Sequence, residues 1–315
     1  MEKVNKQPLI AHVSMFMACA FWGLMSPVGK DAMMHGIDGI SMVSFRVLGG
    51  AILFWITSIF APKEHVPVKD VLMFAGAAVF GLVCNQCCFT IGLGITSPIN
   101  ASIMTTSMPI FAMILSFAIL HEPLTGKKVL GVLIGCCGAL ILIMTSMQAV
   151  SAKEGSMMGD VLCLSAQLSF ALYLSLFNRL VRKYSVFTVN KWMFTWATLY
   201  ILPFTNSHIR VIEWGSIADT TLWEAGYVVF FGTYVSYLLT MIGQKTLRPT
   251  VVSIYNYVQP LVAVIVSVLT GIGVFKWSQG LATLLVFTGV WMVTKSKSRR
   301  DMEKAAVSAA NRTDK

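Results

Sequence analysis

The feature that most constrains this chain is a series of long apolar stretches. Ten segments have the length of about 20 residues that a helix needs to cross a bilayer core of about 30 Å. Only 12% of all residues are charged and 56% are apolar, whereas an ordinary soluble domain carries about 25% charged residues. We therefore predict an all-α integral membrane protein with ten transmembrane helices. The expected spans are Ile10–Gly29, Ile40–Phe60, Val71–Leu93, Ser97–Ile119, Val129–Met147, Gly159–Phe177, Val186–Phe204, Trp223–Ile242, Pro249–Thr270 and Ser278–Thr294.

The positive charge is distributed as in a membrane protein. The formal net charge is +10, and most Lys and Arg residues fall on one set of alternate loops. Because positively charged loops stay in the cytoplasm, we expect a multi-pass protein of the cytoplasmic (inner) membrane with both termini cytoplasmic. A dense basic run follows the last apolar segment, so residues 295–315 are expected to be a cytoplasmic tail. A nucleic-acid partner is not expected.

Metal binding and enzymatic chemistry find little support in the sequence. The seven cysteines all lie inside apolar stretches, where cysteine behaves as a small hydrophobic residue. The run from Cys84 to Cys88 lacks a second ligand cluster. The loop H-E-P-L-T at 121–125 is not the H-E-x-x-H zinc motif, because Thr occupies position 125. We expect no cofactor, no metal site and no enzymatic activity.

Two parts of the chain repeat each other. A stretch from Pro98 to Pro109 aligns with a stretch from Pro249 to Pro260 at a constant offset of 151 residues. Five spans in each copy would turn the second copy upside down relative to the first. Such inverted repeats are typical of alternating-access transporters, whose substrate site lies near the bilayer midplane between the halves. The expected units are residues 1–148 and 149–294.

Several motifs resemble a known family. They are F-W-G-L-M-S-P-V-G-K at 21–30, S-F-R-V-L-G-G-A at 44–51, and the region 97–143 with its helix-breaking proline and H-E-P-L-T loop. The chain is similar to the drug/metabolite transporter superfamily, in the family of paired EamA domains. One departure is Gly273 at the position that matches Glu122. The resemblance implies a ten-helix secondary transporter of metabolites, amino acids or drug-like solutes, commonly an exporter.

Polar residues inside the spans are the candidates for a substrate site, because polar groups facing lipid are costly. Ser253, Asn256 and Tyr257 are spaced to share one helical face of the ninth span. Pro109 and Pro260 are expected to break the fourth and ninth helices, because proline frees a backbone carbonyl. The alternative is that these groups only connect neighbouring helices. The further candidates are Ser102, Thr105, Thr106, Asn85, Gln86, Gln167 and Tyr234.

Arg46 and Trp22 are expected to act near the outer end of the bundle. For Arg46 the sequence leaves two alternatives, a side chain that snorkels to the surface or a gating, anion-attracting group. Asp31 and Asp38 are its expected neighbours in the first outer loop. We interpret Trp22 as a gate residue or an interface anchor.

The mode of action and the assembly stay open at this point. A channel or a non-transporting membrane sensor or scaffold are the alternatives to a transporter. Lipid and a small-molecule solute are the expected partners. The closely spaced glycines of the fifth span permit tight helix packing, either within the chain or in a homodimer. They are Gly131, Gly135 and Gly138.

Overall fold

The computed structural model describes residues 7–96, 98–147, 156–269 and 277–297, and every long regular element in them is a helix. The predicted boundary at 148–149 and the tail beyond 297 lie outside the described residues. The first half comprises α1 (Gln7–Met34), α2 (Gly39–Ser58), α3 (Val68–Ala78), the π-helix η1 (Val79–Cys84), α4 (Asn85–Ile95), α5 (Pro98–Thr105), α6 (Met108–Leu120) and α7 (Gly126–Met147).

The second half follows the same order. It comprises α8 (Met157–Leu176), the short α9 (Asn178–Lys183), α10 (Val186–Arg210), the single turn η2 (Trp214–Ser216), α11 (Asp219–Val229), the π-helix η3 (Phe230–Val235), α12 (Ser236–Thr246), α13 (Pro249–Ile254), the 3-10 turn η4 (Tyr255–Tyr257), α14 (Val258–Leu269) and α15 (Trp277–Thr294).

The described residues of all ten expected spans fall mainly on helices, while residues 97 and 270 lie outside the described part of the chain. Not all of these helices meet the length and composition expected of a membrane span. Seven are long and apolar enough to cross one by length and composition. The expected spans at α10, α13–α14 and α15 are not among the seven in the described residues, so ten crossings stay a prediction. Some ends were misplaced: α10 continues past Phe204 to Arg210, and α1 continues to Met34, so Asp31 belongs to the helix and not to a loop.

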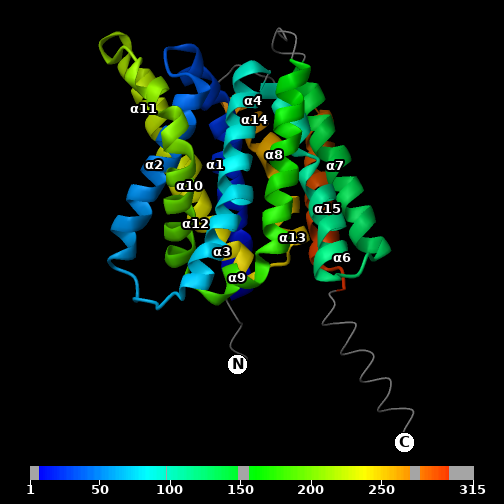
Figure 1. Ribbon diagram of the computed structural model, residues 1–315. Coiled ribbons are helices and arrows are strands. Elements are labelled where there is room, and N and C mark those ends of the chain that lie inside the picture. The colour runs from blue at the N-terminus through cyan, green and yellow to red at the C-terminus, as the bar shows by residue number, and fades with distance from the viewer. Residues whose placement is uncertain (1–6, 97, 148–155, 270–276, 298–315) are drawn as a thin grey trace, which may run out of the picture.

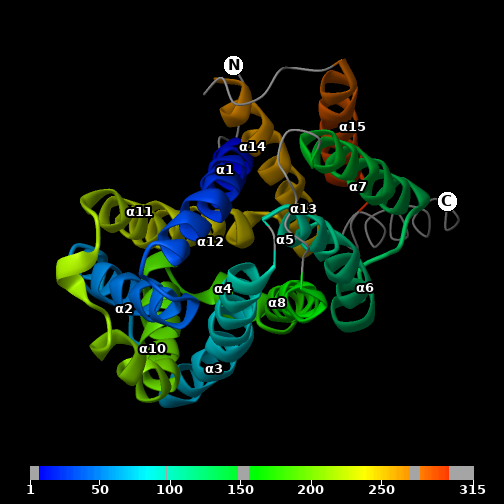
Figure 2. The same ribbon diagram turned by 90° about the horizontal axis from the view of Figure 1, so that it is seen from above.

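The helices form one bundle in which the halves pack against each other. In the view from above, α2, α10 and α11 lie on one side, α7 and α15 on the opposite side, and α1, α4, α8 and α12 between them (Figure 2). The start of α1 and the end of α15 lie at the same end of the bundle (Figure 1). The main contacts are α1 with α12, α4 with α8, α2 with α10, and α7 with α15.

These contacts are related in pairs. The first helix of each half packs on the third helix of the other half, since α1 contacts α12 and α8 contacts α4. The two first helices run in opposite directions: Lys30 near the end of α1 and Asp160 near the start of α8 both bond Thr96. The packing therefore has the pattern of two halves related by an approximate two-fold axis.

Irregular backbone also recurs between the halves. The π-helices η1 and η3 begin at Val79 and Phe230, 151 residues apart, which extends the offset seen in the sequence to the third helix of each half. A second pair of irregularities, residues 106–107 and η4, lies shortly before Pro109 and Pro260. Proline removes a backbone donor and crowds the preceding turn. Helix breaks therefore occur at matching depths in both halves.

The glycines of the fifth span serve packing within the chain. A Cβ on Gly289 of α15 would lie 2.6 Å from the Gly131 carbonyl oxygen, and one on Gly138 would lie 2.7 Å from the Ala282 carbonyl oxygen. Small residues let two helix backbones approach this closely. The glycine face of α7 is thus covered by α15 of the same chain, which corrects the expectation that it could serve a homodimer.

Candidate functional site

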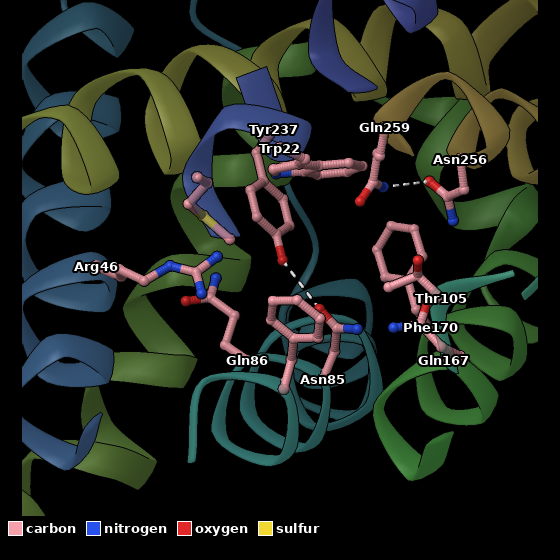
Figure 3. A pocket seen from close by; sticks show the side chains of 12 residues that line it. Trp22, Arg46, Asn85, Gln86, Thr105, Gln167, Phe170, Tyr237, Asn256 and Gln259 are labelled. Atoms are coloured by element: carbon pink, nitrogen blue, oxygen red, sulfur yellow. Dashed lines mark hydrogen bonds between the residues drawn. The ribbon is translucent and has the colours of Figure 1, made fainter. Parts of the chain in front are cut away.

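A central cavity with an empty volume of about 500 Å³ lies between the halves (Figure 3). Residues from α1, α2, α4 and α5 of the first half face residues from α8, α12, η4 and α14 of the second. The walls combine aromatic rings with uncharged polar groups and one cation. The lining residues are Trp22, Met25, Arg46, Asn85, Gln86, Phe89, Thr105, Gln167, Phe170, Tyr237, Asn256 and Gln259.

Seven residues expected from the sequence lie on this cavity. Asn256 and Thr105 face it from η4 and α5, and they are 151 residues apart, so they occupy matching positions in the two halves. The Asn256 side-chain oxygen accepts a hydrogen bond from Gln259 Nε2 at 3.1 Å. The other expected residues on the cavity are Asn85, Gln86, Gln167, Arg46 and Trp22.

Trp22 occupies the cavity wall and not an outer interface. Because α1 extends to Met34, Trp22 lies near the middle of the helix. Its Nε1 donates to the Gly232 carbonyl oxygen at 3.0 Å. Its ring packs edge-on against Phe170 and Tyr237, with centroids 6.2 and 5.9 Å away. Phe170 belongs to α8, the first helix of the second half, as Trp22 belongs to α1, the first helix of the first half.

Other expected residues lie away from the cavity. The Tyr257 hydroxyl donates to the Val132 carbonyl oxygen of α7, and its ring lies against Gly135. Ser253 donates to the Thr250 carbonyl oxygen. Since η4 has about three residues per turn, Tyr257 points toward α7 and away from the cavity that Asn256 lines.

In the fourth and eighth spans, three predicted site residues lie near residues that line the cavity but do not line it themselves. Thr106 donates to the Ile103 carbonyl oxygen, and the Ser102 carbonyl oxygen accepts a bond from Thr105. Tyr234 packs on Phe54 and Phe230. Neither Ser102, Thr106 nor Tyr234 is among the lining residues.

Tyr237 lines the cavity, whereas the sequence favoured Tyr234 among the tyrosines of the same span. It lies directly after η3, and its hydroxyl donates to the Gly81 carbonyl oxygen at 3.3 Å and lies 3.4 Å from Asn85 Oδ1. The sequence favoured Tyr234 because it is the tyrosine nearest the middle of the span, whereas the π-helix η3 shifts the faces that follow it. Gln259 could have been found from its spacing of three residues from Asn256. The remaining lining residues that were missed are Met25, Phe89 and Phe170.

Arg46 is the cation of the cavity, and its side chain does not snorkel. The residue is only 4% exposed. Its Nε donates to Thr233 Oγ1 at 3.0 Å and its Nη1 to Thr90 Oγ1 at 2.8 Å. The expected acidic neighbours are engaged elsewhere, since Asp38 pairs with His208 and Asp31 with His35.

Gln86 lies beside the Arg46 guanidinium in the cavity wall (Figure 3). It is fully buried, and neither its amide nitrogen nor its amide oxygen has a hydrogen-bond partner. Leaving one buried polar group unpaired costs about 1–3 kcal/mol. The cavity thus presents polar groups whose bonding capacity the protein does not use.

A cluster of metal ligands does not accompany the cavity. Among the described residues, no group of three or more His, Cys, Asp or Glu side chains could hold a metal ion. The cysteines, including Cys84, Cys87 and Cys88, are free thiols. The chemistry of the site is therefore hydrogen bonding, one positive charge and aromatic contact.

A bundle of apolar helices around a partly polar cavity is typical of a polytopic membrane protein. The chain belongs to the EamA-like transporter family, whose model matches residues 9–144 and again residues 157–295. The resemblance found in the sequence is thereby confirmed, and membership of this family makes the chain a membrane transporter.

Curated relatives agree with the family. An uncharacterized transporter, YetK of Bacillus subtilis, is 23% identical over 96% of this chain and 92% of its own length. A protein of Escherichia coli K12 named "Probable amino-acid metabolite efflux pump" is 24% identical over 86% of this chain and 90% of its own length. A crystal structure with 14% sequence identity matches 91% of this chain and 98% of its own with a TM-score of 0.70, which shows the shared fold.

Proposed function

We propose that this chain exports a small metabolite, amino acid or drug-like solute by alternating access, through ten transmembrane helices arranged as two inverted five-helix repeats. The proposed units are residues 1–148 and 149–294, followed by a basic tail at 295–315. Both termini are cytoplasmic in this proposal, because that orientation keeps most Lys and Arg residues inside. The name of the Escherichia coli relative supports export and a metabolite as solute.

The observation that carries the proposal is the matched construction of the cavity. The first helix of each half contributes an aromatic ring, Trp22 from α1 and Phe170 from α8, and Thr105 and Asn256 occupy matching positions in the broken helices. A solute in this cavity would contact both halves at once. Movement of one half against the other would therefore change access to it, as in other transporters built from inverted repeats.

Each end of the bundle also has contacts between the halves that such a movement would break. At one end, Lys183 after α8 pairs with Asp70 of α3, and Tyr184 donates to the same Asp70 carboxylate. At the opposite end, Asp160 of α8 accepts hydrogen bonds from Thr96 and Asn100 of the first half. Alternating access requires that these two sets of contacts open in turn.

Counterflow in proteoliposomes tests the proposal. Purified protein is reconstituted in vesicles that are loaded with one unlabelled solute, such as an amino acid, and entry of the same solute in labelled form is followed. The measurement is repeated for each solute of a panel. We expect saturable exchange for at least one solute, because a carrier reorients with its site occupied. Conductance that does not saturate, with no counterflow for any solute, would instead indicate a channel.

A substitution at the cavity makes the experiment specific. Asn256→Leu removes an amide from the cavity wall and is expected to reduce exchange at least tenfold. Asn190→Leu is the matched control, since Asn190 is a fully buried amide of α10 that does not line the cavity. Equal exchange by both variants at equal membrane levels would remove Asn256 from the proposed site.

A further inference from the structure

The positive charge of Arg46 has no counter-ion in the described part of the chain. No described carboxylate lies within 4.0 Å of its guanidinium, and no Asp or Glu lines the cavity. Both partners, Thr90 and Thr233, are neutral hydroxyl groups. A buried charge is costly unless it is paired, so the cavity around Arg46 favours an anion.

The guanidinium is held in a fixed direction with bonding capacity left over. Nε and Nη1 are used by the two threonines, which leaves Nη2 without a recorded bond to a described residue. Thr233 also donates to the Val228 carbonyl oxygen at 2.9 Å, so its hydroxyl is free to accept from Arg46. The side chain is thereby oriented by α4 and η3 before any solute enters.

Gln86 adds a second set of unused groups at the same place. Its amide carries two N–H donors and a carbonyl acceptor, all buried beside Arg46 and unpartnered (Figure 3). A ligand with two neighbouring acceptor oxygens would accept from Arg46 Nη2 and Gln86 Nε2 together. The Gln86 oxygen would remain as an acceptor for a donor group of the same ligand.

We propose that the cavity binds solutes through one carboxylate group, which lies against Arg46 and Gln86. This proposal rests on the proposed transport function and narrows its solute class. One carboxylate neutralises one guanidinium, whereas a phosphate dianion would leave an unpaired negative charge in a site of low dielectric constant. A solute with only a positive charge would meet the Arg46 charge without any acid to offset it.

The rest of the cavity suits an apolar or weakly polar body on that carboxylate. Phe89, Phe170 and Trp22 offer ring surfaces, and the amides of Asn256 and Gln259 lie at the other side of the cavity from Arg46 (Figure 3). Amide oxygens can accept hydrogen bonds from an ammonium or hydroxyl group. Monocarboxylate anions and zwitterions are both compatible, because each presents one carboxylate.

Binding to the purified, detergent-solubilised full chain tests the carboxylate directly. The probes are 3-phenylpropionate, its uncharged isostere 3-phenylpropanamide, phenethylamine and L-phenylalanine, each titrated while the thermal unfolding midpoint is recorded. A ligand that binds only the folded protein raises that midpoint. We expect saturable stabilisation by 3-phenylpropionate or L-phenylalanine and none by the amide or the amine. Equal stabilisation by the amide or the amine, or none by either carboxylate, would overturn the proposal.

Variants assign the effect to the two residues. Arg46→Gln is expected to weaken carboxylate binding by about 10- to 100-fold, as for the loss of a charged hydrogen-bond donor, and Arg46→Lys is expected to retain part of it. Gln86→Leu is expected to weaken it by about two- to tenfold, and it carries the test if Arg46→Gln does not fold. Asn190→Leu is the control and should bind as the wild type does. Unchanged binding in Gln86→Leu and in every folded Arg46 variant would contradict the assignment.

Ligand binding and counterflow are measured separately, so that the carboxylate proposal and the transport proposal can fail independently. Carboxylate binding that depends on Arg46 without any counterflow would support the anion site and contradict the transport proposal. Saturable counterflow of phenethylamine that is unaffected by Arg46→Gln would support transport and contradict the carboxylate proposal.

Discussion

The close approach of α7 and α15 predicts opposite effects for two Gly→Ala substitutions. At Gly226 in α11 an added Cβ would meet nothing within 4 Å, whereas at Gly289 in α15 it would lie 2.6 Å from the Gly131 carbonyl oxygen and 2.7 Å from the Gly135 Cα. Both changes gain about 0.5–1 kcal/mol from the lower backbone entropy of alanine in a helix. Only Gly289→Ala must push two backbones apart.

The cost of the backbone clash follows from the difference in unfolding free energy between the two variants, because the entropy gain of alanine in a helix is common to both and cancels. Overpacking costs about 1–3 kcal/mol, so Gly289→Ala should be less stable than Gly226→Ala by that amount. The net effect is a modest gain for Gly226→Ala and a loss of up to about 2 kcal/mol for Gly289→Ala relative to wild type.

The assay is thermal unfolding in detergent, followed by a dye that fluoresces on reaction with thiols. Cys19 and Cys163 are buried and become reactive on unfolding. A midpoint several degrees lower for Gly289→Ala than for Gly226→Ala is the expected result. Equal midpoints would show that α7 and α15 are not in backbone contact at this point, and would refute the packing argument.

Two further predictions concern charges at the ends of helices. Lys128 and Glu122 form an ion pair with side chains that are 1% and 11% exposed, so Glu122→Gln should lower the unfolding free energy by about 3–5 kcal/mol. The double variant Glu122→Gln with Lys128→Met should recover much of this loss. A double variant as unstable as the single one would contradict this prediction. Lys30 donates to the carbonyl oxygens of Leu93, Gly94 and Thr96 at the end of α4, so Lys30→Met should cost about 1–2 kcal/mol in the same assay. An unchanged midpoint for Lys30→Met would show that these carbonyl groups do not depend on the ammonium group.

The positions of the helices could be predicted from the sequence because they depend on local composition. Apolar stretches of about 20 residues separated by polar loops mark helices in a membrane protein, and the described residues of all ten expected segments are mainly helical. The end of α1 was placed too early, because Lys30 and Asp31 were taken as a loop. In the structure Lys30 stays in the helix and bonds carbonyl groups at the end of α4.

The faces of the helices were harder to predict than their positions. A constant 3.6 residues per turn placed Tyr257 on the same face as Ser253, but η4 changes the number of residues per turn at that position. Tyr234 was favoured for its depth in the eighth span, but it lies inside the π-helix η3 and does not line the cavity. The polar residues Asn85, Gln86 and Gln167 were easier, because polar groups in apolar segments turn toward the bundle interior. The aromatic Phe170 gave no such signal, since an aromatic ring can face either lipid or the bundle interior.

Arg46 shows where the sequence leaves alternatives that only packing decides. Its depth in α2 allowed either snorkelling or burial. Burial follows from Thr90 and Thr233, which approach from α4 and η3 and hold the guanidinium by hydrogen bonds. These contacts connect residues 44 and 187 positions away in the chain, which a local pattern cannot reveal.

The central claim is that one cavity between the two halves opens alternately to the two sides of the membrane. Gln259→Cys, in a chain whose seven native cysteines are replaced, reports access to the cavity by its reaction with an impermeant maleimide added from either side. Asp70→Asn weakens the contact with Lys183 at one end of the bundle and should shift the population toward the state open at that end. We expect faster labelling from that side and slower labelling from the other. Labelling that rises on one side without falling on the other, or that occurs from one side only, would contradict it.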